Sequence, residues 1–304
     1  MKRLLLFIAT EKGYTALRSL ITNGQQGHIG AVITFREVNV EKDWSCDIES
    51  ECDASKIPCF LWRKVKSDLI GLIRKYSITG AVAIAWRYLL PLTINQYLED
   101  DLIIFHDSLL PKYRGFAPTP TAIICGETTI GVTALFATKE IDQGDIILQK
   151  QMHISSDMYI NDIIKKQSRL YACMLKIIIE QMEANSLTAY PQNESDATYS
   201  IWRNSEDCHI DWSRSAKEIY DFIRAVGKPY PGAFTYMDEK KVIIEQAMAL
   251  NYDLNFCIRD VGKIWRIADG NPEIICGKGM LEIIGAISEE GVPIQFNKVR
   301  CRLV

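Results

Sequence analysis

Apolar runs alternate with amphipathic stretches through the first two thirds of the chain, and this alternation constrains the fold more than any other feature. Short apolar runs such as "RLLLFIA" (3–9) and "TGAVAIAW" (79–86) are separated by stretches with helical periodicity such as "YTALRSLITN" (14–23). Continuous apolar runs are typical of parallel strands buried on both faces, and parallel pairing requires crossover helices between them. The pattern predicts an α/β fold with an open, doubly wound, Rossmann-like and mostly parallel sheet.

Two loop segments follow buried strands of this predicted sheet. They are "WRYLLP" (86–91) and "HDSLLP" (106–111), and a third strand pattern, "IGVTALFAT" (130–138), leads into "KEIDQGDI" (139–146). In open α/β sheets, ligands bind outside the carboxyl ends of the strands. We therefore expect the first two loops to converge on one crevice.

The segment "NSLTAYPQNESDATYS" (185–200) is polar and rich in turn residues, and it follows a long helical pattern over residues 158–184. Such composition indicates a linker, so we predict a catalytic Rossmann-like domain over residues 1–195 and a second domain over residues 196–304. After one helical pattern, this second domain shows several short strand-like runs separated by glycines. These runs favour a small C-terminal β-barrel of the OB type.

Charge and cysteine content exclude several classes of protein. The net charge is −3, with 35 basic and 38 acidic residues, so no long-range positive field exists to attract nucleic acid or an anionic membrane. No window reaches the roughly 18 apolar residues that span a bilayer. Nine cysteines without a CxxC pair argue against a zinc site and against a disulfide framework. We expect a cytoplasmic protein with reduced thiols and no bound metal.

The candidate catalytic residues surround the end of the apolar run that precedes "HDSLLP". His106 is one of only four histidines, and a histidine can donate a hydrogen bond or move a proton near neutral pH when a carboxylate such as Asp142 orients it. The alternative is a half-buried histidine that closes a strand. Asp107, Ser108 and Asp145 are the other candidates, and the residues alone do not choose among them.

Two long strings in this region resemble the core of the folate-dependent formyltransferases. These strings are "HDSLLPKYRGFAP" (106–118) and "AIICGETTIGVTALFATKEIDQGDIILQ" (122–149), and they occur in the family's order. A third string, "HIDWSRSAKEIYDFIRAVGKPYPGAF" (209–234), is similar to the start of the C-terminal barrel of family members. These members act on nucleotide-linked amino sugars and on initiator methionyl-tRNA. The resemblance is specific for the fold and the one-carbon donor, and less specific for the acceptor.

The resemblance implies that N10-formyltetrahydrofolate donates its formyl group to a primary amine at an Asn, His and Asp constellation. The matching histidine is His106 and the matching aspartate is Asp142, whereas Ile104 stands at the position of the asparagine. Attack of the amine places negative charge on the formyl oxygen and positive charge on nitrogen. A donor from His106 would stabilise the oxygen, and Asp142 would orient the imidazole and help remove the amine proton. Isoleucine can do neither.

The resemblance also implies a pterin pocket built mainly from the backbone of two loops. The residues expected in this pocket are Trp86, Arg87, Tyr88, Leu89, Ala137, Glu140, Ile141 and Asp142. Contacts with the acceptor are expected from Ser108, Lys112, Arg114 and Phe116. Alternatives remain open: Arg87 as a surface charge over a strand end, Arg114 as a residue that pins its loop, and Ser108 as a backbone-bonding residue, which we favour over a nucleophile.

Taken together, the sequence predicts an N-formyltransferase that acts on a nucleotide-linked amino sugar of the UDP or dTDP type, as used in bacterial polysaccharide biosynthesis. The lack of basic surplus disfavours nucleic acid as a partner, because tRNA binding depends on phosphate neutralisation. Methionyl-tRNA formyltransferase remains the alternative enzyme. A folate-binding homologue with impaired catalysis is the alternative that Ile104 suggests. The oligomeric state, including a homodimer, stays open.

Overall fold

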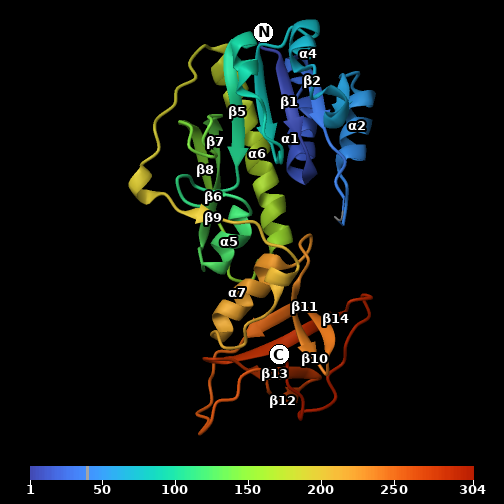
Figure 1. Ribbon diagram of the computed structural model, residues 1–304, viewed down its shortest axis with the longest axis vertical. Coiled ribbons are helices and arrows are strands. Elements are labelled where there is room, and N and C mark those ends of the chain that lie inside the picture. The colour runs from blue at the N-terminus through green and yellow to red at the C-terminus, as the bar shows by residue number, and fades with distance from the viewer. Residues whose placement is uncertain (39–40) are drawn as a thin grey trace. The chain divides into compact units, whose positions relative to one another are not determined.

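The computed structural model describes residues 1–38 and 41–304, which form two compact units (Figure 1). The first unit contains residues 1–118, 129–154 and 162–200, and the second contains residues 119–128, 155–161 and 201–304. Residue 195, at which the sequence places the end of the first domain, lies inside the last stretch of the first unit.

A seven-stranded sheet forms the centre of the first unit. Its strands, in spatial order, are β3 (Cys59–Leu61), β2 (Ile29–Thr34), β1 (Leu4–Ile8), β4 (Gly80–Ile84), β5 (Asp100–His106), β7 (Thr129–Phe136) and β8 (Ile146–His153). The strands from β3 to β5 pair in parallel, and β7 and β8 are antiparallel to their neighbours. The predicted mostly parallel, Rossmann-like sheet is therefore confirmed.

Helices cover both faces of this sheet, which is why the strand β1 is apolar at every position. Leu4, Leu6 and Ile8 belong to one core cluster, whereas Leu5 and Phe7 belong to the cluster on the other face. The helices of the unit are α1 (Thr10–Thr22), α2 (Ser45–Ala54), α3 (Trp62–Val65), α4 (Leu69–Lys75) and α6 (Ile160–Glu183). Short 3-10 turns are formed by Gln26–His28, Leu92–Tyr97 and Glu194–Asp196.

Residues 190–200, called the strap below, return from the end of α6 to the edge of the sheet. The backbone of Tyr190 makes two hydrogen bonds with Ile146 at the start of β8. Farther along, β9 (Tyr199–Ser200) pairs in parallel with β6 (Arg114–Gly115), the two-residue strand that follows β5. The segment that the sequence identifies as a linker is thus tied to the sheet edge and to the loop after His106.

The second unit is built on a five-stranded antiparallel sheet with the order β10-β11-β14-β13-β12. Its elements are α5 (Pro118–Ile124), a 3-10 turn (Glu206–Cys208), α7 (Ala216–Val226), β10 (Ala233–Met237), β11 (Lys240–Ala249), β12 (Ile264–Ala268), β13 (Asn271–Ile275) and β14 (Met280–Ser288). Near the C-terminus, Leu303 bridges Met237 in β10, and Arg302 bridges Lys263 beside β12. These bridges link the two outer strands, in agreement with the predicted small barrel.

The helix α7 shows how local sequence fixes one boundary in this unit. Ser215 accepts from the backbone N–H of Glu218, and the Glu218 carboxylate accepts from the backbone of Ser215. This reciprocal capping box satisfies backbone donors that a helix start otherwise leaves open. Among the described residues, no helix of either unit is long and apolar enough to cross a membrane.

Candidate active site

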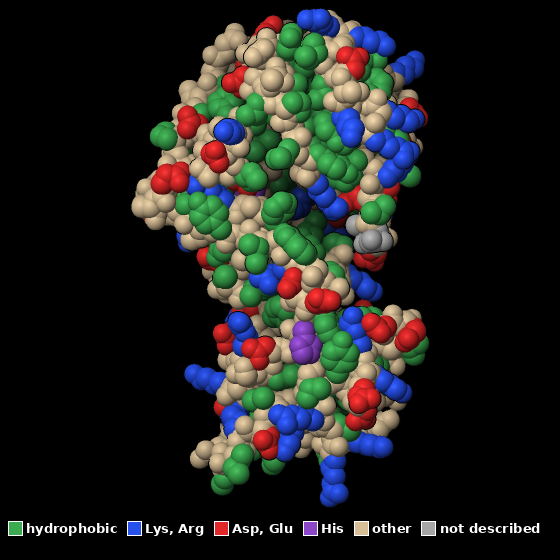
Figure 2. Space-filling model, viewed as in Figure 1, with side chains coloured by type: hydrophobic (Ala, Val, Ile, Leu, Met, Phe, Trp, Pro, Cys, Tyr) green, Lys and Arg blue, Asp and Glu red, His purple; other side chains and the backbone are tan. Residues whose placement is uncertain are grey.

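A pocket of about 260 Å³ opens at the carboxyl ends of β4 and β5 in the first unit. Its walls come from four segments, which are the loop after β4, the end of β5, residues 115–116 farther along that loop, and the loop after β7. The lining residues include Trp86, Arg87, Tyr88, Leu89, Leu90, Ile104, His106, Gly115, Phe116, Ala137, Glu140, Ile141 and Asp142. Figure 2 shows a hollow surrounded by hydrophobic side chains on the viewed face of this unit. The sequence-predicted convergence of the two loops is therefore present.

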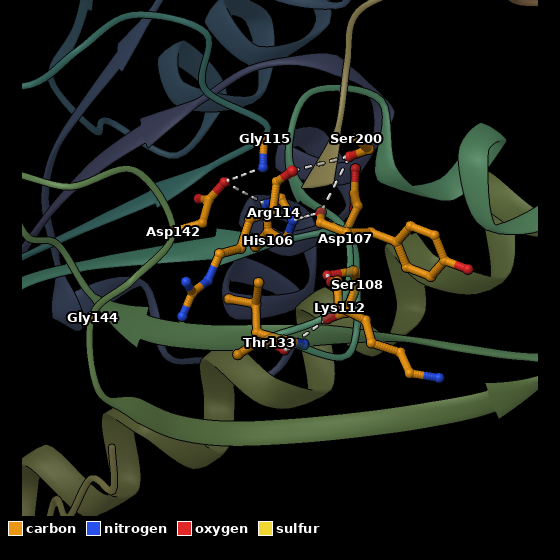
Figure 3. A network of polar contacts seen from close by, with 12 residues as sticks. His106, Asp107, Ser108, Lys112, Arg114, Gly115, Thr133, Asp142, Gly144 and Ser200 are labelled. Carbon is orange, nitrogen blue, oxygen red and sulfur yellow. Dashed lines mark hydrogen bonds and ion pairs between the residues drawn. The ribbon is translucent and has the colours of Figure 1, made fainter. Parts of the chain in front are cut away.

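His106 and Asp142 lie together in this pocket, and both side chains are largely buried (Figure 3). The imidazole Nδ1 is 3.5 Å from the carboxylate Oδ2 of Asp142. The same carboxylate oxygen accepts a hydrogen bond of 2.8 Å from the backbone N–H of Gly115. The two residues that the family pattern pairs are thus neighbours, although they are far apart in sequence.

The second ring nitrogen determines the tautomer of His106. Its Nε2 lies 2.8 Å from the carbonyl oxygen of Tyr113, and a carbonyl can only accept, so Nε2 carries a hydrogen. Nδ1 then faces the carboxylate of Asp142. Both nitrogens already have partners in the protein. A hydrogen bond from His106 to a developing oxyanion would therefore have to replace one of these contacts.

Ile104 shares a face of β5 with His106, because residues two apart on a strand point to the same side. It lines the pocket and also packs against the buried cluster of Leu110, Leu135 and Ile146. Its side chain offers no hydrogen bond. The position where the family pattern has an amide is therefore apolar and partly packed.

All the residues expected to form the pterin pocket do line this cavity. Trp86 makes edge-to-face contacts with Phe7, Phe35 and Trp62, with ring centroids 5.2 to 5.5 Å apart. Its buried indole N–H makes no hydrogen bond among the described residues. Trp86 thus forms a fixed aromatic wall of the cavity, with its N–H buried in the protein.

Arg87 is both a residue of the pocket and a surface charge over a strand end, the two alternatives that the sequence leaves open. It lines the pocket and is 56% exposed, and its guanidinium lies 2.5 Å from the buried carboxylate of Glu37. Burial raises the pKa of Glu37, and the positive charge of Arg87 acts against that rise. Arg87 therefore serves as the charged partner of Glu37 at the strand ends while it borders the cavity.

The four residues expected to contact the acceptor have different environments. Phe116 lines the pocket and is 57% exposed, so its ring can reach a ligand. Ser108 is buried and its Oγ donates to the carbonyl of Lys112 at 2.6 Å, which matches the backbone-bonding alternative. Lys112 is exposed and lies outside the lining of the pocket.

Arg114 is only 1% exposed. Its guanidinium donates to both carboxylate oxygens of Glu194, at 2.7 and 2.8 Å, and to the side-chain oxygen of Gln192. These contacts correspond to the loop-pinning alternative for Arg114. The guanidinium is directed at the strap, and its donors are used within the protein.

Sequence reasoning missed a buried polar cluster next to His106. Lys12 in α1 contacts the carboxylate of Asp107 at 2.5 Å, and the hydroxyl of Tyr171 in α6 donates to the same carboxylate. Burial opposes ionisation of Asp107, but Lys12 and Tyr171 outweigh it and hold the pKa of Asp107 below its usual value. Burial and the nearby Asp107 raise the pKa of Tyr171 well above its usual value. No spacing in the sequence connects these residues.

No group of three or more His, Cys, Asp or Glu side chains in the described part of the chain could hold a metal ion.

Comparison with known proteins now identifies the family. The formyl transferase model matches residues 3–175, and the model of the formyl transferase C-terminal domain matches residues 203–299. The chain belongs to the formyltransferase family, as its sequence motifs predict. It is 31% identical to methionyl-tRNA formyltransferase of Marinobacter nauticus over 67% of this chain, and that match spans 65% of the relative. It is 30% identical to the bifunctional polymyxin resistance protein ArnA of Wigglesworthia glossinidia brevipalpis over 93% of this chain and 42% of that protein.

Solved structures share the fold at lower sequence identity. WlaRD, a sugar 3N-formyl transferase crystallised with dTDP and 5-N-formyl-THF, aligns with a TM-score of 0.69 at 17% identity, over 98% of this chain and 99% of that chain. An N-formyltransferase from Helicobacter canadensis, in complex with folinic acid and dTDP-3-aminofucose, also aligns with a TM-score of 0.69, at 18% identity, over 93% of this chain and 99% of that chain. These likenesses support the two-part fold.

Proposed function

We propose that this protein transfers the formyl group of N10-formyltetrahydrofolate to the primary amine of a nucleotide-linked amino sugar. The observation that carries the proposal is the pocket at the ends of β4 and β5, in which His106 and Asp142 lie 3.5 Å apart beside an aromatic wall. Family membership supports formyl transfer as the reaction class. The sugar acceptor is supported by the relatives crystallised with dTDP or a dTDP-linked sugar.

The pocket fits the ring end of a folate. Its lining is mainly apolar and aromatic, with few polar groups, which is typical of sites for small heterocycles. Bound N10-formyltetrahydrofolate supplies an activated formyl carbon for attack by an amine.

His106 and Asp142 would handle the proton that the attacking amine must lose. With Nε2–H held by the carbonyl of Tyr113, Nδ1 and the Asp142 carboxylate form one proton-accepting unit. Asp142 is itself held by the Gly115 N–H, which keeps the carboxylate oriented toward the ring.

A second candidate, methionyl-tRNA formyltransferase, is favoured by the 31% identity to such an enzyme. The net charge of −3 argues for a sugar acceptor, because tRNA binding releases counterions from many neutralised phosphates. A third candidate, a folate-binding protein with impaired catalysis, is favoured by Ile104, which places an apolar side chain where the family pattern has an amide.

Three measurements separate these candidates. Calorimetry with 5-formyltetrahydrofolate, a stable analogue of the donor, should show binding, and absence of heat and of a thermal shift would refute the folate site. Mass spectrometry across UDP- and dTDP-linked amino sugars should detect formylation. Efficient, salt-sensitive formylation of methionyl-tRNA with every sugar unmodified would reverse the choice of acceptor. Binding without turnover on any amine would support the impaired homologue.

A further inference from the structure

We propose that Gln192, in the strap, is a positioning residue that holds Asp142 in place beside His106. The sequence identifies the strap as a linker, and the family motifs used above do not include it. The role in turnover rests on the proposed formyl transfer, whereas the structural effect on Asp142 does not.

The side-chain amide of Gln192 spans the turn that carries Asp142. Its Nε2 donates to the carbonyl oxygen of Asp142 and to that of Gly144, both at 2.8 Å. Its Oε1 accepts from Arg114, at 2.8 Å from Nη2 and 3.2 Å from Nε. Both amide hydrogens and the amide oxygen are therefore used, which fixes the rotamer and the direction of the amide.

Arg114 gives Gln192 a rigid support. The guanidinium is 1% exposed and makes a bidentate pair with Glu194, also in the strap. Bidentate arginine–carboxylate pairs fix orientation as well as position. The next residue, Gly115, donates its N–H to Asp142 Oδ2, so Asp142 is held through its carbonyl by the strap and through its carboxylate by the loop after β5.

The same loop also holds His106. Its ring donates to the carbonyl of Tyr113, and the hydroxyl of Ser200 in the strap donates to the carbonyls of Tyr113 and Arg114 (Figure 3). The strap thus contacts the backbone that holds His106 and also the backbone of Asp142. Within the strap, Gln192 is the residue whose side chain bonds to the turn of Asp142.

The turn needs this support because its backbone is unusual. Asp142 has φ of 57°, in the left-handed region that costs most residues energy. At Gly144, a Cβ atom would lie 1.8 Å from the carbonyl oxygen of Phe136, so the turn passes very close to the end of β7. Without the Gln192 amide, two carbonyls lose their donor and the turn can relax. A misplacement of about 1 Å can cost up to a hundredfold in rate.

The test compares Gln192→Leu with Asn193→Ala, a neighbouring strap substitution. The Asn193 side chain bonds to Ser195 and Asp196 within the strap. We expect Gln192→Leu to lower kcat at least about tenfold while both KM values change less than about threefold, because positioning and not binding is lost. We also expect the Gly115 amide to exchange its hydrogen at least about tenfold faster, since its acceptor moves. Asn193→Ala should match the wild type in both.

A second variant, Gln192→Glu, tests the same contacts if Gln192→Leu fails to fold. Gln192→Glu keeps the size and the acceptor for Arg114 but cannot donate to the two carbonyls, so it should show the same two effects. Folded variants with wild-type kcat and wild-type Gly115 exchange would overturn the proposal. So would a rate loss with unchanged Gly115 protection. If no amine is ever formylated, the proposed function fails, and the Gly115 exchange still decides the positioning role.

Discussion

The substitution Ile104→Asn restores the amide that the family pattern places two residues before the histidine. Ile104 lies on the same face of β5 as His106 and lines the pocket, so an asparagine there would point its amide toward the reacting groups. His106 already uses both nitrogens within the protein, which leaves the developing oxyanion short of a side-chain donor. We therefore expect slow natural turnover and a faster Ile104→Asn variant.

The size of the effect follows from two opposing terms. A well-aimed oxyanion donor is worth about 3 to 4 kcal/mol, or about a hundredfold or more in rate. Because the amide must fit a site shaped for isoleucine, we expect a gain of about tenfold or more. Ile104 packs against Leu110, Leu135 and Ile146, and an amide buried there without partners costs about 1 to 3 kcal/mol of unfolding free energy.

The assay measures turnover and thermal unfolding on the same preparations. Ile104→Leu is the matched control, since it keeps an apolar side chain of similar volume and should leave turnover near that of the wild type. Each kcal/mol lost should lower the Tm by about 2 to 4 °C. A well-folded Ile104→Asn variant with unchanged or lower turnover would show that the site stabilises the oxyanion without asparagine, and the reasoning would be wrong.

Two further predictions concern the groups around β5. His106→Ala and Asp142→Ala should each lower turnover at least about a hundredfold, with folate binding kept in His106→Ala; wild-type turnover in either would place the chemistry elsewhere. Asp107→Asn should destabilise the protein at neutral pH by up to about 3 kcal/mol, because it leaves the buried ammonium of Lys12 without its counterion. The folded-state pKa of Asp107 is lowered, so its contribution is present above the unfolded-state pKa and is lost as pH falls through the folded-state value. Urea unfolding between about pH 3 and pH 7 should therefore show a weaker acid dependence in Asp107→Asn than in the wild type; an unchanged dependence would contradict the assignment.

Apolar periodicity predicts the parts of the fold that are buried on both faces. The strands β1, β4 and β5 read directly as apolar runs, and the loops after β4 and β5 meet at the pocket as expected. Strand β8 is not predicted by apolar periodicity, because it lies at the sheet edge and carries Gln149, Lys150 and Gln151 in its middle. An edge strand that faces solvent has no need of an apolar run.

The motif strings locate His106 and Asp142, but they do not show what holds these residues. The partners of His106 are a backbone carbonyl and a residue far along the chain, and neither contact follows from local spacing. The strap is polar because its side chains satisfy buried groups of the first unit, as Glu194 does for Arg114. From composition alone, such a polar segment is predicted to be a linker. Its contacts with Arg114 and the other residues around the site are seen only in the structure.

The strap also determines where this chain can be recombined with its relatives. A chimera joined at residue 195 would take Gln192 and Glu194 from one parent and the β9 strand from the other, and would split the contacts to Arg114 and Gly115 between two sequences. At Gly115, a Cβ atom would lie 2.5 Å from the carbonyl oxygen of Ser200, so the parent that supplies this loop must have glycine there. A crossover after Ser200 leaves the first unit with its own strap and exchanges residues 201–304, whereas residues 119–128 and 155–161 of the second unit stay with the N-terminal parent.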